Sequence, residues 1–510
     1  MLPSLLLSAL ALVPQPQTVI ELGGVTTNDA VVFRVDPSVP SEGYRLTITD
    51  AGTEIVHSDG AGRLYAQVTR DQLKSADGSS YAKVRIVDAP AFPWRGWLLD
   101  VCRHWFPKED VLSVLDVMVL HKMNVFHWHL TEDQAWRLPI EGYPELLQYG
   151  TVRPYHPVHG RDRWRKVRGW VEDVGTPSYG PFAYTRQDVS EILAYARARH
   201  IRVVPEIDMP GHMRALLAAY PELGCRPDIL STNRVPRATW GVEDDVLCVG
   251  NDKTVAVALD ILDKVCDMFP ESDIIHIGGD ECPTNRWANC SRCRARMKAE
   301  GLSTPRELQT WFCKRISERL RARNRKAVGW AEVVQRPGLA PEDVIPMAWI
   351  SHSEHLKNLG YYCPKFSELV DRGYDVVAGS HEHAYWGTPH DFAGDEYEPP
   401  TPPGSNYLVS LEKAYSLVLD AGEPCTGKGR ILGTEAYSWG ECVWNFFDLM
   451  WKALPRTCAI AEIAWSNPRP RNYADFHERM KSHARRLRQM SIPCAPLDPP
   501  TRNPSKDGNE

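Results

Sequence analysis

Carboxylates, an arginine and tryptophans follow a series of short apolar segments in this chain. The densest case is Asp280-Glu281, which comes directly after Ile274-Ile-His-Ile-Gly-Gly279. The two glycines would let the backbone turn tightly and present both carboxyl groups. Carboxylates bind hydroxyl groups and indole faces stack on pyranose rings, so the pattern favours glycoside hydrolysis. The residues that follow the other segments are Asp100, Arg103, His104, Trp105, His127, His129, Glu132, Asp133, Glu206, Asp208, His212, Trp330, Glu332, Trp349, Tyr385, Trp386, Trp439 and Glu441.

The spacing of Asp280 and Glu281 limits the mechanism. Glycoside hydrolysis needs a proton donor for the leaving oxygen and a group that stabilises the cationic transition state. Adjacent residues at a strand end point in different directions, so the pair would hardly flank one bond as acid and nucleophile. One carboxyl group can be the acid, and the nucleophile can come from the substrate. The carbonyl oxygen of an N-acetyl group at sugar C2 can reach C1, so we expect an N-acetylated sugar.

The apolar segments alternate with helical patterns, which is typical of βα units around a parallel sheet. Thr185 with Asp188, and Thr304 with Glu307, resemble capping boxes at helix starts. The pattern predicts a (β/α)8 barrel, whose active site lies at the carboxyl ends of the strands. An open doubly wound sheet is the alternative. The expected strands are Gly96–Val101, Asn124–Leu130, Ile201–Ile207, Ile274–Ile277, Ala327–Trp330, Val344–Trp349, Tyr374–Ala378 and Ile431–Ala436.

The ends of the chain differ from this pattern. Leu2 to Val13 is an apolar run with a small-residue cleavage site at Ala9-Leu-Ala11, although no Lys or Arg precedes it. We interpret residues 1–17 as a signal peptide and expect an exported protein. Residues 18–90 alternate with period two around one helix, Ala61–Leu73, and predict a small α+β domain. Residues 91–494 would form the barrel, and residues 495–510 a polar, disordered tail.

Composition excludes other classes. The 510 residues are 43% hydrophobic and 24% charged, with a net charge of −6 and 17 tryptophans. A mildly acidic chain offers no basic face for nucleic acid. No apolar stretch reaches 18 residues, so we expect no stable membrane insertion.

Two groups of residues could bind a metal. Cys290 and Cys293 form a CxxC with Cys282 nearby, but a zinc knuckle needs a fourth ligand and no second CxxC exists. We interpret these cysteines as structural, either a local disulfide or buried thiols. His127-x-His129, with Asp208, His212 and His276, permits a metal-dependent amidohydrolase as a second hypothesis. We favour packing roles for these histidines, and predict no metal and no cofactor.

Four motifs resemble the family 20 glycoside hydrolases, which are exo-acting β-N-acetylhexosaminidases. They are Asp100-Val-Cys-Arg103-His104, Asn124-Val-Phe-His-Trp-His-Leu130, Pro205-Glu-Ile-Asp-Met-Pro-Gly-His212 and His276-Ile-Gly-Gly-Asp-Glu281. The resemblance implies N-acetylhexosamine-containing oligosaccharides or glycoconjugates as substrates, with terminal β-linked GlcNAc and GalNAc both open, and a substrate-assisted retaining mechanism. An intact set of Asp280, Glu281 and Tyr385 argues against a non-catalytic sugar-binding relative.

The resemblance also implies a role for each site residue. Glu281 would be the general acid and then the base, Asp280 would orient the acetamido group, and Tyr385 would donate to its carbonyl oxygen. His212, backed by Glu132, would tune the acid. The remaining residues would bind the sugar, Arg103 and Glu441 through its hydroxyls and Trp330, Trp349 and Trp439 as pocket walls.

Three positions depart from the family pattern. Glu132 precedes Asp133 where the family usually has two aspartates, so the distance from Glu132 to His212 is in question. Trp386-Gly387 stands where an aromatic or Leu and then Asp or Asn are common, which suggests a changed hydroxyl contact. Ala331 replaces an aspartate between Trp330 and Glu332.

Overall fold

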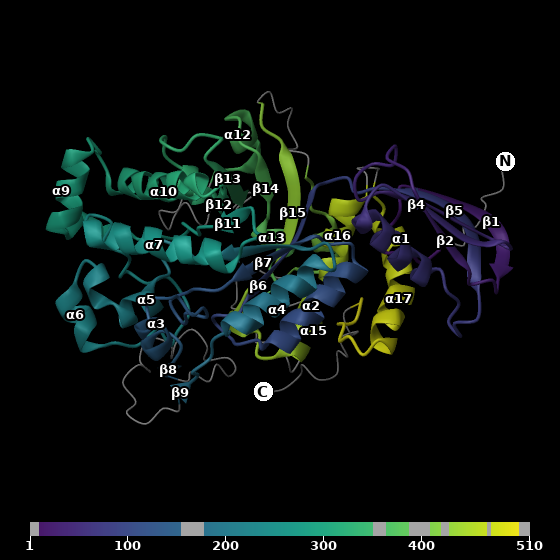
Figure 1. Ribbon diagram of the computed structural model, residues 1–510, viewed down its shortest axis with the longest axis horizontal. Helices are drawn as coiled ribbons and strands as arrows, with labels where there is room; N and C mark the ends of the chain where they lie inside the picture. The colour runs from purple at the N-terminus through teal and green to yellow at the C-terminus, as the bar shows by residue number, and fades with distance from the viewer. Residues whose placement is uncertain are drawn as a thin grey trace, which may run out of the picture.

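The computed structural model describes residues 10–154, 178–349, 364–386, 409–419, 428–466 and 471–498. Eight parallel strands close into a barrel in the order β10-β11-β12-β13-β14-β15-β6-β7 (Figure 1). The closed ring confirms the predicted (β/α)8 barrel and excludes the open sheet. Its strands are β6 (Trp94–Asp100), β7 (Val125–His129), β10 (Arg202–Glu206), β11 (Ile274–His276), β12 (Lys326–Trp330), β13 (Val344–Ala348), β14 (Val376–Ala378) and β15 (Ile431–Ser438).

The helices around the barrel begin where the sequence predicts. Thr185 and Asp188 form a capping box before α4 (Arg186–Arg197). Thr304 and Glu307 form another before α10 (Pro305–Ala322). These boxes satisfy backbone N–H groups that the first turn of a helix leaves unpaired. The other long helices are α2 (Lys108–Leu120), α7 (Asp252–Met268), α15 (Phe446–Ala453), α16 (Arg456–Trp465) and α17 (Tyr473–Gln489).

Short elements lie in the loops between the barrel strands and helices. These are α3 (Glu145–Tyr149), β8 (Arg153–Pro154), β9 (Ser178–Tyr179), α5 (Arg214–Ala219), η2 (Pro221–Leu223), α6 (Pro227–Thr232), α8 (Asn285–Asn289), α9 (Ser291–Ala299), η3 (Ala331–Val334), α12 (Phe366–Asp371), α13 (His381–Ala384), α14 (Leu411–Tyr415) and η4 (Gly440–Cys442). No helix in the described part of the chain combines the length and apolarity that a membrane crossing requires.

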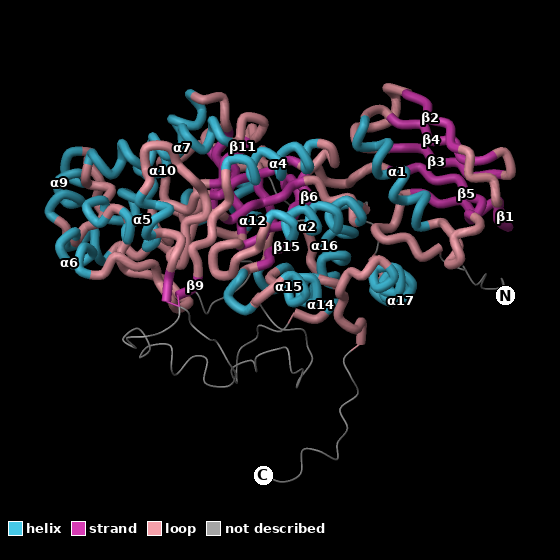
Figure 2. The backbone as a smooth tube through the Cα atoms, turned by 60° about the horizontal axis from the view of Figure 1, so that its bottom comes forward, coloured by secondary structure: helices cyan, strands magenta, loops and turns pink. Residues whose placement is uncertain are grey.

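The small N-terminal domain is a five-stranded sheet with one helix, as Figure 2 shows. Helix α1 (Gly60–Gln72) starts at Asp59, whose carboxylate accepts from the backbone N–H of Gly62. The helix packs on β3 and β4, and its Tyr65 meets Trp465 of α16 edge to face at 5.2 Å. The sheet order is β1-β5-β3-β4-β2, from β1 (Thr18–Thr26), β2 (Val31–Val35), β3 (Tyr44–Thr49), β4 (Gly52–His57) and β5 (Tyr81–Asp88).

A buried ion pair and the first described residues join this domain to the barrel. Lys122 lies 2.9 Å from Asp88, and both side chains are fully buried. Leu12 and Val13 are also buried, and Arg479 of α17 donates to the Leu12 carbonyl at 2.7 Å. The fold therefore includes part of the segment predicted as a leader, and cleavage after Ala11 would leave both residues in the mature chain.

Candidate active site

The turn after β11 presents Asp280 and Glu281 through two glycines with positive φ. Gly278 has φ +64°, and a Cβ there would lie 1.7 Å from Oδ1 of Asp208. Only glycine fits this close approach. Glu281 itself has φ +41°, which is uncommon for a residue with a side chain and costs backbone energy. The surrounding structure therefore holds this carboxyl group in a strained position.

The two carboxyl groups have environments that favour their neutral forms. The Glu281 side chain is 29% exposed, and its burial raises its pKa to about 7. Asp280 is 15% exposed at its side chain, and burial also raises its pKa. Oδ1 of Asp280 is buried and has no hydrogen-bond partner among the described residues. The pair thus offers a proton donor beside an acceptor oxygen that a ligand could satisfy.

His212 links this pair to Glu132. Its Nδ1 lies 2.7 Å from Oε1 of Glu132, and its Nε2 lies 3.7 Å from Glu281 and 3.8 Å from Asp280. Burial lowers the pKa of His212, but Glu132 and Asp280 outweigh burial and hold it well above its ordinary value. A protonated His212 thus faces both carboxyl groups. The longer Glu132 side chain, in question from sequence, makes this contact at normal hydrogen-bond distance.

Arg103 sits at the opposite side of Glu132. Its guanidinium lies 3.1 Å from Asp100 and 3.1 Å from Glu132, and 5.3 Å from the centre of the Trp439 ring. Glu441 is half-buried and acts on Arg103 through its charge. The two carboxylate contacts fix the arginine so that its remaining donors have a set direction.

Three tryptophans and a tyrosine form an aromatic group beside the acids. The Tyr385 ring lies 6.0 Å from Trp439 and 6.3 Å from Trp349, nearly parallel to the latter. Trp330 lies 5.8 Å from Trp439 and donates to Glu206 at 2.9 Å. Burial and the charge of Asp280 raise the pKa of Tyr385 well above its usual range, so its phenol stays a proton donor.

Glu206 organises the histidines below this group. Its carboxylate accepts from the Trp330 indole at 2.9 Å, lies 2.8 Å from Nδ1 of His276 and 3.1 Å from Nε2 of His127, and contacts His129. Burial raises the pKa of Glu206, but the three imidazoles more than offset this and hold it well below its ordinary value. The sequence placed Glu206 at a strand end without a role. The sequence feature that could have revealed this role is the i, i+2 spacing of His127 and His129, which places both on one face of a strand, together with His276 on another strand.

The five residues of the metal hypothesis do not form one group. His127 and His276 lie with Glu206, Asp208 and His212 lie with Glu132, and His129 lies with Asp100 and Cys102. In the first group, both ring nitrogens of His127 and Nδ1 of His276 contact carboxylates. A packing role for these histidines stays our prediction.

Two further buried acids and one buried tryptophan lie near these residues. Asp208 accepts from the Gly279 N–H at 3.0 Å, and Glu332 accepts from the Trp349 indole at 3.0 Å. Both are buried, and burial raises the pKa of each. Trp386, which precedes the departure at Gly387, is fully buried with the Arg456 guanidinium 4.7 Å from its ring. It packs in the core, whereas Gly387 lies outside the described residues.

Fold and site together define a class: a (β/α)8 barrel with carboxyl groups and tryptophans gathered at the carboxyl ends of its strands. The model of the glycosyl hydrolase family 20 catalytic domain matches residues 92–468, and that of the family's domain 2 matches residues 10–89. The chain belongs to glycosyl hydrolase family 20.

Proteins that are similar to this chain are named as hexosaminidases. A Beta-hexosaminidase of Porphyromonas gingivalis is 35% identical over 93% of this chain, and one of Akkermansia muciniphila is 31% identical over 88%. The chain spans 57% of the first relative's length and 84% of the second's. A crystal structure of a beta-N-acetylhexosaminidase matches 97% of this chain and 98% of its own, at 27% identity and a TM-score of 0.81. The beta-N-acetylhexosaminidase of Bacteroides fragilis matches 95% and 96%, at 27% identity and 0.76.

Proposed function

We propose that the protein is an exo-acting β-N-acetylhexosaminidase that removes terminal, non-reducing β-linked GlcNAc or GalNAc with retention of configuration. One observation carries the proposal. Glu281, with a pKa of about 7, stands next to Asp280, whose buried Oδ1 has no hydrogen-bond partner among the described residues. This is a proton donor paired with an acceptor for a substrate N–H, the two functions that substrate-assisted hydrolysis needs.

In the first step, Glu281 donates its proton to the glycosidic oxygen while the acetamido carbonyl oxygen attacks C1. The bond from C1 to the leaving oxygen breaks, and the new bond from C1 to the acetamido oxygen closes an oxazolinium ring. The Asp280 carboxylate accepts a hydrogen bond from the acetamido N–H and stabilises the positive charge of the oxazolinium ring. Tyr385, protonated because burial raises its pKa, donates to the attacking carbonyl oxygen and fixes its position.

In the second step, the Glu281 carboxylate takes a proton from water, and that water attacks C1. The bond from C1 to the acetamido oxygen breaks, and the acetamide is restored. His212 supports both states of Glu281, because its positive charge at 3.7 Å keeps the pKa of Glu281 from rising further. An acid with a pKa near the working pH can donate in one step and accept in the next.

The rest of the pocket would bind the terminal sugar. Trp330, Trp349 and Trp439 offer indole faces to the acetamido methyl group and the pyranose ring. Arg103 and Glu441 would bind the ring hydroxyls. The substrates would be N-acetylhexosamine-containing oligosaccharides or glycoconjugates. We also propose export to the periplasm or the extracellular space, on the strength of the apolar run at Leu2–Val13.

The test is hydrolysis of aryl β-GlcNAc and aryl β-GalNAc side by side, with a thiazoline inhibitor as the control. We expect turnover of at least one substrate and inhibition by the thiazoline, which imitates the oxazolinium ring. An aryl β-glucoside, in which hydroxyl replaces the acetamide, should be nearly inert. Efficient hydrolysis of this analogue would contradict substrate assistance.

A further inference from the structure

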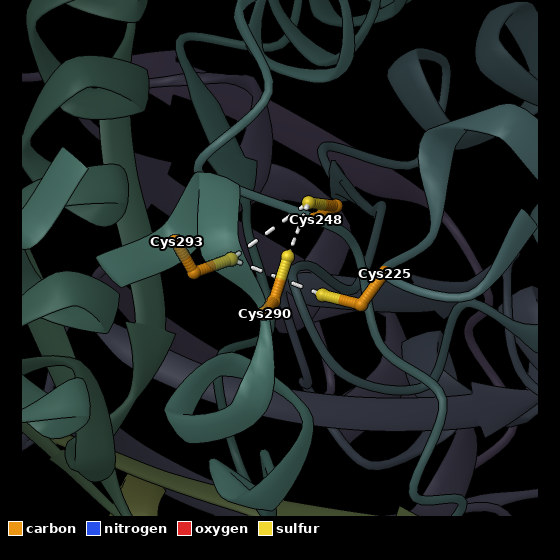
Figure 3. A group of neighbouring side chains, drawn as sticks. All are labelled: Cys225, Cys248, Cys290 and Cys293. Carbon is orange, nitrogen blue, oxygen red and sulfur yellow. Dashed lines mark hydrogen bonds between the residues drawn. The ribbon is translucent and has the colours of Figure 1, made fainter. Parts of the chain in front are cut away.

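Four cysteines that are far apart in sequence converge beside the barrel (Figure 3). The Sγ atoms of Cys225 and Cys293 lie 3.8 Å apart, those of Cys248 and Cys290 lie 3.8 Å apart, and those of Cys248 and Cys293 lie 3.7 Å apart. All four sulfurs lie within 4.8 Å of one another. Cys282, which we grouped with the CxxC pair from sequence, is not among them. Cys225 and Cys248 supply the partners that the sequence did not reveal.

The spacing fits a metal and not a disulfide. A disulfide joins two sulfurs at about 2.05 Å. Sulfurs at the corners of a tetrahedron around zinc, with Zn–S of about 2.3 Å, lie about 3.8 Å apart. Moreover, Cys248 and Cys293 each contact two other sulfurs, an arrangement that pairwise bonding does not produce.

The backbone around the cluster allows the four cysteines to come close together. An antiparallel bridge pairs Gly224 with Leu247, so the next residues, Cys225 and Cys248, come from two adjacent strands of chain. A Cβ on Gly250 would lie 2.3 Å from the Cys293 backbone nitrogen, so a glycine is required there. Three of the four cysteines are buried and the other is half-buried. The site is therefore shielded from solvent on most sides.

The local charge favours thiolates. Cys290 is the N-cap of α9, and Cys293 lies in its first turn, where the helix dipole stabilises negative charge. The Arg292 guanidinium donates to the Gly224 carbonyl at 2.9 Å, and its charge acts on Cys248. Four thiolates around a divalent cation carry a net charge of −2, which this arginine and the helix terminus would partly balance.

We propose that Cys225, Cys248, Cys290 and Cys293 bind one structural zinc ion in a tetrahedral site. Four protein ligands leave no open position, so the ion would not take part in catalysis. Its place in the fold indicates a positioning role. The Leu247 N–H, next to Cys248, donates to the Pro210 carbonyl at 3.0 Å, two residues before His212. The Leu247 carbonyl accepts from the Trp287 indole at 2.8 Å, which ties in the segment after Glu281.

The zinc ion would thus cross-link the loops that follow β10 and β11, and these loops carry His212 and Glu281. Another buried group in the described residues, His121, Cys458 and His483, offers a contrast. There, hydrogen bonds already account for the contacts: His121 meets the Val117 carbonyl at 2.8 Å and His483 at 2.9 Å. In the four-cysteine cluster the sulfurs contact one another at 3.7–3.8 Å, and hydrogen bonds between thiols are weak.

The test is the metal content of the full chain, purified with zinc in the medium and dialysed against buffer without metal. Inductively coupled plasma mass spectrometry should find about one zinc ion per chain. Cys293→Ser should lower this ratio at least about five-fold, because one ligand is lost. Cys313→Ser, which changes a buried cysteine of α10 outside the cluster, is the matched control and should keep the zinc.

X-ray absorption at the zinc edge of the unmodified protein decides the case even if Cys293→Ser does not fold. We expect about four sulfur neighbours at about 2.3 Å. Nitrogen or oxygen ligands, disulfides among the four cysteines, or metal-free protein with four thiols that react freely after denaturation would overturn the proposal. Neither result depends on glycoside hydrolysis, so the zinc site and the proposed activity can fail separately.

Discussion

Glu206 and Glu281 belong to neighbouring barrel strands and show what decides the chemistry of a buried carboxyl group. Glu206 ends β10, pairs across the sheet with His276, accepts from the Trp330 indole and contacts three imidazoles. Glu281 follows β11 on a strained turn, is 29% exposed and has His212 at 3.7 Å as its nearby cation. The pKa of Glu206 lies well below its ordinary value, whereas that of Glu281 is raised to about 7.

The difference lies in the partners and not in the residue type, and the more deeply buried Glu206 has the lower pKa. Burial raises the pKa of both groups, because it penalises the charged form. Three imidazoles overcome this penalty at Glu206 and lock it as a carboxylate. At Glu281 a single imidazole at longer range does not. A buried carboxylate with several hydrogen-bonding or charged partners stays ionised and stabilises the fold. A buried carboxyl group with few such partners stays protonated and can act as an acid.

The largest effect should come from Glu281→Gln. The amide cannot donate a proton to the leaving oxygen, so kcat/KM for substrates with poor leaving groups should fall roughly 10²–10⁴-fold. Binding should change little, since the amide keeps the shape of the side chain. Steady-state kinetics on a natural disaccharide and on an aryl glycoside with a good leaving group would measure both. Full activity of the variant on the disaccharide would show that Glu281 is not the acid.

Glu206→Gln should instead act on stability. The amide removes the negative charge between protonated His127 and His129, which leaves each histidine with one carboxylate, Glu435 or Glu132, in place of two. Breaking a buried charge network in this way costs about 3–5 kcal/mol. Urea unfolding should show the loss. As the control, Glu271→Gln, which removes an exposed ion pair with Arg197, should cost less than about 1 kcal/mol. Equal stability of the two variants would refute the structural role of Glu206.

Asp280→Asn separates the two members of the acidic pair. The amide removes the negative charge beside the oxazolinium ring and can turn its NH2 toward the acetamido N–H. We expect kcat/KM for N-acetylated substrates to fall about 10²-fold, in line with the loss of one electrostatic contact in a transition state. The thiazoline inhibitor should weaken in parallel. A variant that loses turnover but binds the thiazoline as tightly as the unmodified protein would point to a different role for Asp280.

Much of the fold could be predicted from local patterns. The eight strand segments alternate with helices whose caps, such as Thr304 with Glu307, are visible in the sequence. Most pocket residues could also be found, because a barrel brings the ends of its strands together. His212 with Glu132 and Asp280 with Glu281 come from motifs that stand at those ends.

Long-range pairing could not be predicted. Cys225 and Cys248 lie in loops with no periodicity, and tertiary contacts such as the Gly224–Leu247 bridge and the Arg292–Gly224 hydrogen bond bring them to the CxxC pair. The same holds for Glu206, whose partners sit on three strands. The sequence also could not show that Trp386 packs in the core, because an aromatic residue after Tyr385 could equally well contact a bound sugar.

The pH profile tests the raised pKa of Glu281 directly. Since this carboxyl group must be protonated for the first step, kcat/KM should fall about ten-fold per pH unit above its pKa of about 7. In Glu281→Gln this limb should disappear from the residual activity. His212 should not produce the limb, because Glu132 and Asp280 hold its pKa well above the ordinary value. An unchanged limb in the variant would assign it to another group.

The smallest effect should be a gain in stability from the change that removes activity. Glu281 has a pKa of about 7 in the folded chain and 4.5 as the ordinary value, so the folded state binds more protons between these pH values. Stability therefore falls as pH rises from 4.5 to 7, and the loss persists above 7. Gln has no charge to bury and escapes this loss. At pH 8 the variant should be more stable by roughly 1–2 kcal/mol, a value reduced for the partial exposure of the side chain. At pH 4 the two proteins should unfold at the same urea concentration. A variant that is less stable at pH 8 would mean that the strained turn at Glu281 depends on the carboxylate.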